Sequence, residues 1–205
     1  MRHVVYTLRR LLSPNYAVIP VSEETLLKEP WSFTCAMIVF PGGADLGYCH
    51  ALNGEGNRKI LQFVRAGGAY LGLCAGGYYG SKRCEFEVGD KKMEVVGPRE
   101  LAFFPGTCRG CAFKGFVYHS EAGAKAVRLN VEKGTLTGEN LPDSFRSYYN
   151  GGGVFVDAGK HKNCGVEVLA SFEKDLDVDG DDGKAAVIYC KVGEGGAVLS
   201  GPHPE

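Results

Sequence analysis

The chain has 205 residues, 30 of them glycine, and a formal net charge of −1 at pH 7. This length suits one domain over residues 1–205, and the near-neutral charge argues against nucleic acid or a membrane surface as a partner. No apolar run is long enough to cross a bilayer, and the N-terminus does not follow the pattern of a signal peptide. The eight cysteines are therefore expected to be reduced thiols in a cytoplasmic protein.

The first third of the chain alternates helical and extended patterns. Apolar residues at spacings of three and four favour helices, and Pro or Gly ends them. The expected elements are a helix from Val4 to Leu12, a strand from Ala17 to Val21, a short helix from Ser22 that ends at Pro30, a buried strand from Cys35 to Phe40, a polar loop from Ala44 to Gly54, and a helix with Ile60, Leu61 and Val64 on its apolar face that stops at Gly67-Gly68. The many glycines between these runs suit an α/β protein with tight connections.

The run from Ala69 to Gly77 predicts a buried strand that turns at Cys74 directly into a helix. A side chain on such a turn sits in a strained backbone conformation, and the close approach of strand and helix leaves room only for small residues such as Gly72 and Gly76. The first N–H groups of the helix favour a thiolate, and the N–H of Ala75 is aimed to receive an oxyanion. The alternative interpretation is an inert cysteine at the end of a strand.

Two further motifs have the residue types that such a nucleophile needs. Pro41-Gly42-Gly43 follows a buried strand and can turn the backbone N–H of Gly43 toward a neighbouring nucleophile. His203 and Glu205 lie two residues apart in an extended segment, so their side chains point the same way. Glu205 can therefore orient His203 as the base for a cysteine elsewhere in the chain.

The second half of the chain is rich in short β patterns. We expect an antiparallel β insertion over about 84–117 beside the main sheet. Its expected strands are Glu85–Val88, Met93–Val96, Leu101–Phe103 and Phe113–Val117, and the strands expected after it are Ala126–Val131, Val154–Val156, Val166–Ser171, Ala186–Val192 and Gly196–Leu199. The glycine-rich stretch 147–153 predicts a loop that packs closely against another part of the molecule.

The cysteine turn, the Pro-Gly-Gly loop and the terminal His-Pro-Glu, in this order, resemble the class I glutamine amidotransferase family. Residues 40–79, 118–123 and 148–155 resemble more specifically the amidotransferase-like N-terminal domain of fungal biotin–protein ligases. The resemblance covers nearly the whole chain. It implies a three-layer, flavodoxin-like α/β fold with helices on both faces of the sheet. This family opens with a strand before its first helix, so a strand is expected upstream of the helix that opens this chain.

The resemblance also implies a catalytic triad of Cys74, His203 and Glu205, with an oxyanion hole at Gly43 and Ala75. It places the loop with Tyr149 and Asn150 near the active site as candidate substrate contacts. Gly42 is a further candidate. So is Tyr78, in a helix expected from Ala75 to about Lys82, although an aromatic residue near a helix start more often joins the core.

Three other patterns are weaker. Cys108-Arg-Gly-Cys111 has the spacing of a zinc or redox pair, but without a second pair plain thiols or a disulfide are expected. The stretch 175–181 mimics half of an EF-hand loop and is interpreted as a hairpin tip. His119 is interpreted as a structural loop histidine; the alternative is a second catalytic histidine. No metal and no cofactor are expected.

These observations lead to a first hypothesis, a cysteine-dependent amidohydrolase of the glutaminase type that acts on a small amide-containing molecule through a thioester. The alternative is a non-catalytic regulatory module that binds a small amide, a biotin-related ligand, or a partner such as a ligase or synthase domain. A redox or glyoxalase-like enzyme, which shares the strand–cysteine–helix turn, ranks last. The resemblance does not extend to biotin ligation, because the chain has no motif for that chemistry.

Overall fold

The computed structural model describes residues 2–134, 140–179 and 183–205. The helices are α1 (Arg2–Leu12), α2 (Glu23–Lys28), α3 (Asp45–Leu52), α4 (Glu55–Arg65) and α5 (Ala75–Gly80), with 3-10 turns η1 (Trp31–Phe33) and η2 (Ala158–Cys164). The strands are β1 (Met37–Phe40), β2 (Ala69–Leu73), β3 (Ser81–Phe86), β4 (Val95–Pro98), β5 (Phe104–Gly110), β6 (Lys125–Val131), β7 (Ser144–Tyr149), β8 (Val154–Phe155), β9 (Val166–Phe172), β10 (Ala185–Val192) and β11 (Gly195–Ser200).

A seven-stranded sheet has the order β1-β2-β11-β10-β9-β6-β7. The β1, β2 and β11 strands are parallel to one another, and the remaining pairs are antiparallel. In register, Gly72 of β2 lies between Phe40 of β1 and Leu199 of β11. The carboxyl ends of these three strands therefore meet at one edge of the sheet, which brings together three segments that are far apart in the sequence.

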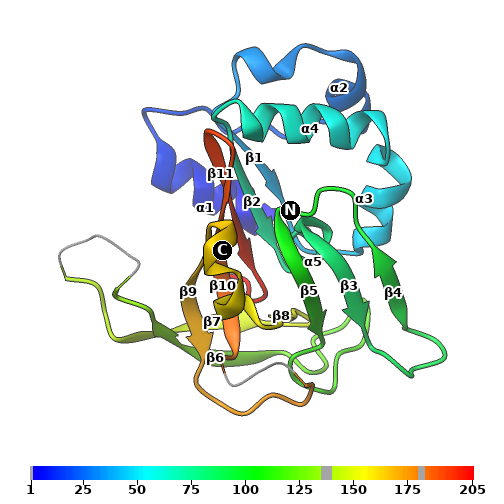
Figure 1. Ribbon diagram of the computed structural model, residues 1–205, viewed down its shortest axis with the longest axis vertical. Helices are drawn as coiled ribbons and strands as arrows, with labels where there is room; N and C mark the ends of the chain where they lie inside the picture. The colour runs from blue at the N-terminus through cyan, green and yellow to red at the C-terminus, as the bar shows by residue number, and fades with distance from the viewer. Residues whose placement is uncertain (1, 135–139, 180–182) are drawn as a thin grey trace.

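A second sheet of four strands has the order β4-β3-β5-β8 and lies beside the first (Figure 1). It corresponds to the expected insertion but corrects it in two respects. It is mixed, because β3 pairs with β5 in parallel and with β4 antiparallel. It also recruits β8 from much later in the chain. The stretches 101–103 and 113–117, expected as strands, are irregular.

The helices form as their sequence signals require. Ser22 caps α2 by accepting a hydrogen bond from the N–H of Thr25 at 3.1 Å. The apolar face of α4 is buried, and α2 and α3 pack against that helix at one end of the sheet (Figure 1). α5 packs against β2, β11 and β3, between the two sheets. This arrangement confirms the expected α/β class.

Three expectations for individual segments are corrected. Residues 17–21 are not a strand in the structure. The segment expected as a polar loop over 44–54 contains α3, whose Cys49 and Leu52 are buried against neighbouring elements. The helix after Cys74 ends at Gly80, because β3 begins at the next residue.

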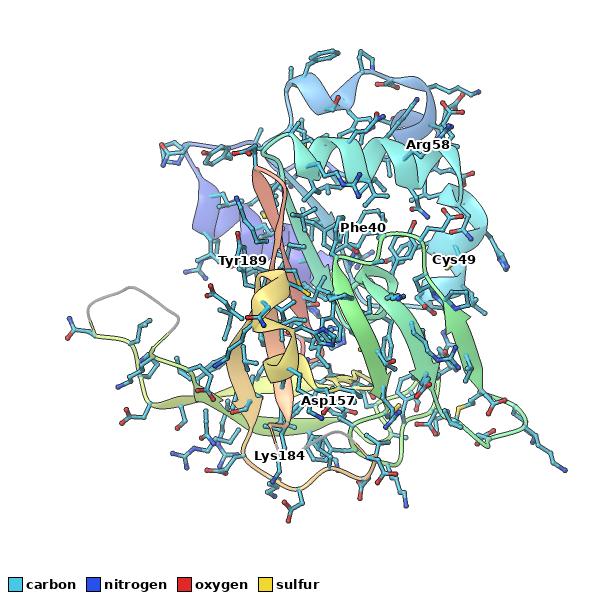
Figure 2. The ribbon with its side chains drawn as sticks, viewed as in Figure 1. Phe40, Cys49, Arg58, Asp157, Lys184 and Tyr189 are labelled. Atoms are coloured by element: carbon cyan, nitrogen blue, oxygen red, sulfur yellow. The ribbon has the colours of Figure 1, made fainter. Side chains whose placement is uncertain are left out.

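Aromatic packing fixes the end of β1. Phe40, labelled in Figure 2, stacks on Tyr70 with ring centroids 5.4 Å apart and meets Tyr48 of α3 edge-on at 5.0 Å. The hydroxyl of Tyr48 donates a hydrogen bond to the carbonyl of Pro41 at 2.9 Å. α3 therefore holds the Pro-Gly-Gly loop in place. None of the helices in the described part of the chain has the length and apolar composition of a membrane-crossing segment.

Candidate active site

Cys74 occupies the sharp turn between β2 and α5. Its backbone has φ +49° and ψ −102°, a conformation that non-glycine residues rarely adopt. The turn is fixed because the N–H of Cys74 donates to the carbonyl of Ser200 at 2.8 Å, and its carbonyl accepts from Gly77 and Tyr78 at 2.9 and 3.1 Å. Hydrogen bonds to β11 on one side and to α5 on the other therefore maintain the strained backbone conformation of Cys74.

The close approach predicted for Gly72 and Gly76 is confirmed. A Cβ on Gly72 would lie 2.3 Å from the carbonyl oxygen of Gly76, and a Cβ on Gly76 would lie 2.0 Å from the carbonyl oxygen of Phe40. Both distances are far below van der Waals contact with backbone atoms, which cannot easily move. Strand, helix and the neighbouring strand β1 therefore pack at a spacing that only glycine permits.

His203 is clamped beside this turn. Its backbone N–H donates to the carbonyl of Tyr148 at 2.8 Å, and its ring meets the Tyr148 ring at 5.8 Å between centroids. On another side, a Cβ on Gly42 would lie 2.4 Å from the Cε1 atom of His203, so Gly42 leaves the space that the ring fills. His203 Nδ1 and Glu205 Oε1 are 3.0 Å apart.

Burial of the His203 ring lowers its pKa, but hydrogen bonding to Cys74 and Glu205 and the negative charges of both outweigh burial and raise the pKa to about 10. Burial raises the pKa of Glu205, but its hydrogen bond to His203 and the charge of that ring hold the pKa below its ordinary value. The arrangement thus favours an imidazolium at His203, held between the Glu205 carboxylate and the Cys74 sulfur.

A cavity of about 620 Å³ opens over these groups. Its lining includes most of the residues predicted for the site, namely Gly42, Gly43, Cys74, Ala75, Tyr78, Asn150, His203 and Glu205. The thiol of Cys74 lies 3.8 Å from the carbonyl oxygen of Asn150, so the glycine-rich loop after β7 closes directly over the cysteine.

Tyr149 is the predicted contact that the structure does not bring to the cavity. It is fully buried, and its hydroxyl donates to the carbonyl of Gly152 at 2.8 Å and accepts from the N–H of Phe113 at 3.0 Å. Successive residues of a strand face opposite sides, so the neighbouring Tyr148 lines the cavity instead. Tyr78 does line the cavity, but it is almost fully buried and its hydroxyl already donates to Gly151 at 3.2 Å.

Several lining residues escaped the sequence analysis. Phe86, Phe116 and Tyr118 form a group of aromatic rings, and Glu121 lies beside Tyr148. Asp45, the first residue of α3, lines the cavity and pairs with the buried Arg99 at 2.7 Å. The sequence signal for Phe116, Tyr118 and Glu121 was their position in and beside 118–123, a segment singled out only for its family resemblance, whereas Phe86 had no such signal. His119 lies on the same side of the cavity and is exposed.

The cysteine pair and the described part of the EF-hand-like stretch form no metal site. Cys108 and Cys111 are both free and buried, and burial raises the pKa of each thiol. Within the described ranges, no group of three His, Cys, Asp or Glu side chains is placed to hold a metal ion. The EF-hand-like stretch falls partly outside the described residues, and Asp177 within it accepts a hydrogen bond from the N–H of Lys114 at 2.9 Å.

Comparison with known proteins identifies the family. The whole chain, residues 1–205, matches the family described as biotin–protein ligase, N terminal. The chain belongs to this family. Biotin–protein ligase of Schizosaccharomyces pombe is 46% identical over 193 residues, which are 94% of this chain and 29% of that protein. This member of the family therefore spans less than a third of the length of the ligase that it matches.

Further relatives extend the comparison. An uncharacterized protein of Chlamydia muridarum is 36% identical over 208 aligned residues, which are 100% of this chain and 74% of that protein. Among solved structures, a ThuA-like protein of Bacteroides uniformis has a TM-score of 0.52 at 15% identity and covers 100% of this chain and 76% of its own. A protein of Thermoplasma acidophilum, described as part of a GMP synthase, has a TM-score of 0.52 at 12% identity, with 99% and 78% covered. At such low identity these structures speak for the fold alone, which is of the glutamine amidotransferase type.

Proposed function

We propose that this biotin–protein ligase N-terminal domain hydrolyses a small carboxamide, with Cys74 as nucleophile, His203 as general acid and base, and Glu205 as the group that orients His203. The observation that supports this most is the clamped imidazole. Its ring is fixed beside the strained cysteine turn, it is 3.0 Å from Glu205, and its pKa is raised by hydrogen bonding to Cys74 and Glu205.

In the first half of the reaction, the thiolate of Cys74 attacks the amide carbon. A C–S bond forms, and the carbonyl π electrons move to oxygen. When the tetrahedral intermediate collapses, the C–N bond breaks and the imidazolium of His203 gives its proton to the departing nitrogen, which leaves as ammonia. The product is a thioester on Cys74 and a neutral His203.

In the second half, water attacks the thioester carbon while His203 takes a proton from that water. Collapse then breaks the C–S bond, releases the carboxylic acid and restores the thiolate–imidazolium pair. Glu205 keeps the ring oriented through both halves and stabilises its positive charge.

The oxyanion of each intermediate needs N–H donors. The first N–H of a helix has no intrahelical acceptor, so that of Ala75 is free for this task. The second donor is the N–H of Gly43, in a loop that α3 holds against the His203 ring. Loss of one such donor typically costs about 2.7–4 kcal/mol of transition-state stabilisation.

A binding module is the second candidate. It is favoured by the match to less than a third of a protein named for a ligase reaction, which leaves a ligase domain as a natural partner. In this case the same cavity would hold an amide without cleaving it, and the Cys74 thiol would be no more reactive than an ordinary cysteine.

The rate at which iodoacetamide alkylates Cys74, read by mass spectrometry, separates the two candidates. Cys164 is exposed and serves as the internal reference thiol. We expect the buried Cys74 to react faster than Cys164 at neutral pH, and His203→Asn to slow Cys74 by about tenfold or more while Cys164 is unchanged.

An ammonia-release assay on a panel of primary carboxamides then tests turnover. We expect Cys74→Ala and His203→Asn each to reduce the rate by at least about 10³-fold. Labelling of Cys74 that is no faster than that of Cys164 and indifferent to His203 would contradict the enzyme and leave the binding module.

A further inference from the structure

A network of polar side chains lines the cavity away from the triad. The hydroxyl of Tyr148 donates to Oε2 of Glu121 at 2.6 Å, and this bond raises the pKa of Tyr148. The side-chain Nδ2 of Asn150 donates to the carbonyl of Ser120 at 3.1 Å and contacts the Tyr148 hydroxyl at 3.4 Å. The orientation of the Asn150 amide is therefore fixed, because a flipped amide would place its oxygen against the Ser120 carbonyl.

This network leaves an acceptor without a donor. Oδ1 of Asn150 is buried and has no hydrogen-bond partner among the described residues. A buried polar atom in that state costs free energy unless a ligand or water completes it. Because this atom is enclosed, the groups of the network that an occupant of the cavity can reach are Glu121 and Tyr148, which are both exposed.

The charges of the residues that line the cavity also favour a cationic ligand. Its carboxylates are Asp45, Glu121 and Glu205, and the described lining contains no lysine or arginine. Asp45 is compensated by Arg99, and Glu205 is compensated by His203. Glu121 pairs with no cation in the described part of the chain: His3 and His119 also line the cavity, but neither forms an ion pair with it.

An aromatic wall completes this side of the cavity. Phe86 and Phe116 meet edge to face at 5.7 Å, Phe116 and Tyr118 at 4.9 Å, and Tyr118 closes the group against Phe86 at 6.0 Å. Tyr118 is 37% exposed and Phe116 is partly buried, so faces of these two rings can contact a ligand, whereas Phe86 is buried and supports them. Such faces attract cations and repel anions, and the attraction grows when water is excluded.

We propose that the cavity selects carboxamides that carry an ammonium group, with the ammonium bound by Glu121 and by Phe116 and Tyr118 of the aromatic wall. The choice of a carboxamide rests on the proposed function, whereas the preference for a cation rests on these side chains alone. A carboxylate in the same place would meet the carboxylate of Glu121, with no basic side chain of the described lining to compensate it.

Three carboxamides of matched length test this preference. They are 4-aminobutanamide, a cation, pentanamide, which is neutral, and glutaramate, an anion. Binding to the Cys74→Ala variant is measured by calorimetry, so that no turnover interferes. We expect affinity to fall in the order cation, neutral, anion, with the cation bound at least about tenfold more tightly than the anion.

Glu121→Gln keeps the size of the side chain and removes its charge. When Glu121→Gln is added to the Cys74→Ala variant, we expect the logarithm of the affinity ratio between the cation and the anion to fall by about half or more. The affinity for pentanamide should be unchanged. The matched control is Glu167→Gln, an exposed glutamate of β9 outside the cavity, which should leave all three affinities unchanged. Equal binding of the three ligands, binding of none of them, or a cation preference that survives Glu121→Gln would overturn the proposal.

The outcome is separable from that of the proposed function. Selective binding of the cationic amide without ammonia release by the unmodified domain would support the proposed ligand class and contradict the proposed hydrolysis. Ammonia release at the same rate from all three amides would support hydrolysis and contradict the ligand class.

Discussion

The carboxyl edge of the parallel strands and the four-stranded sheet each contain a buried cysteine, and they give it different surroundings. Cys74 stands on a turn with positive φ, beside an imidazole and a cavity. Cys108 lies within β5, fully buried, and burial raises the pKa of its thiol well above its ordinary value. Burial is therefore common to both thiols. The surroundings of the two thiols differ because Cys74 lies at the end of its strand, where it meets the imidazole of His203.

The two regions are joined by one buried ion pair. Arg99 follows β4 of the four-stranded sheet, and its Nε donates at 2.7 Å to Asp45, which begins α3 at the cavity. The Nη1 atom of Arg99 is held by the carbonyls of Gly97 and Pro98. Substitutions at this ion pair, at the cysteine turn and at His203 test what each of them contributes to the stability of the protein.

The largest effect is expected for Arg99→Met. This change leaves Asp45 buried without its partner, and we expect the free energy of unfolding to fall by about 3–5 kcal/mol. Urea titration measures it. Arg83→Met is the matched control, since Arg83 forms a half-exposed pair with Glu85 and should cost only about 0–1 kcal/mol. Equal losses of unfolding free energy for the two variants would show that the buried Arg99–Asp45 pair contributes no more to stability than the half-exposed pair.

Gly76→Ala is expected to act more moderately, and at the cysteine turn. The added Cβ collides with the carbonyl of Phe40, so we expect a loss of about 1–3 kcal/mol of unfolding free energy. Labelling of Cys74 should slow as well. Gly47→Ala, within α3 and with open space around it, should instead stabilise the protein by about 0.4–1 kcal/mol. Unchanged stability of Gly76→Ala would contradict the close packing of β2, α5 and β1.

The third effect is the pH dependence of the free energy of unfolding that His203 contributes. Because folding raises its pKa from 6.5 to about 10, its stabilising contribution is fully present below pH 6.5 and is lost as the pH rises toward 10. The difference in unfolding free energy between the unmodified domain and His203→Asn should therefore shrink over that range. Chemical denaturation at a series of pH values measures it. A difference that stays constant would mean that Cys74 and Glu205 do not stabilise the imidazolium of His203.

Local signals predicted part of this molecule well. The glycine spacing around Cys74 predicted the turn, because a close approach of strand and helix leaves room only for small residues at Gly72 and Gly76. Helical periodicity likewise identified α1 and α4. α3 was missed because Asp45–Leu52 has no apolar stripe, and its burial comes from contacts made elsewhere in the chain.

The site was predictable only in outline, for a similar reason. Whether Tyr148 or Tyr149 faces the cavity depends on the register of β7 against β6, which pairs Tyr149 with Lys125 and Tyr148 with Ala126. A shift of one residue would exchange the two faces. The aromatic wall was also hidden, because Phe86 and Tyr118 come from separate segments that only the folded chain brings together.

The placement of β11 has a consequence for when Cys74 meets His203 during folding. This strand inserts between β2 and β10, near the middle of the sheet, and it carries the segment that leads to His203. Cys74 is made 129 positions earlier in the chain. During synthesis and folding, the cysteine therefore lacks its imidazole until this late, non-local strand pairing is complete. Under the proposed function, this order of folding delays the activation of the Cys74 thiol until the cavity around it has formed.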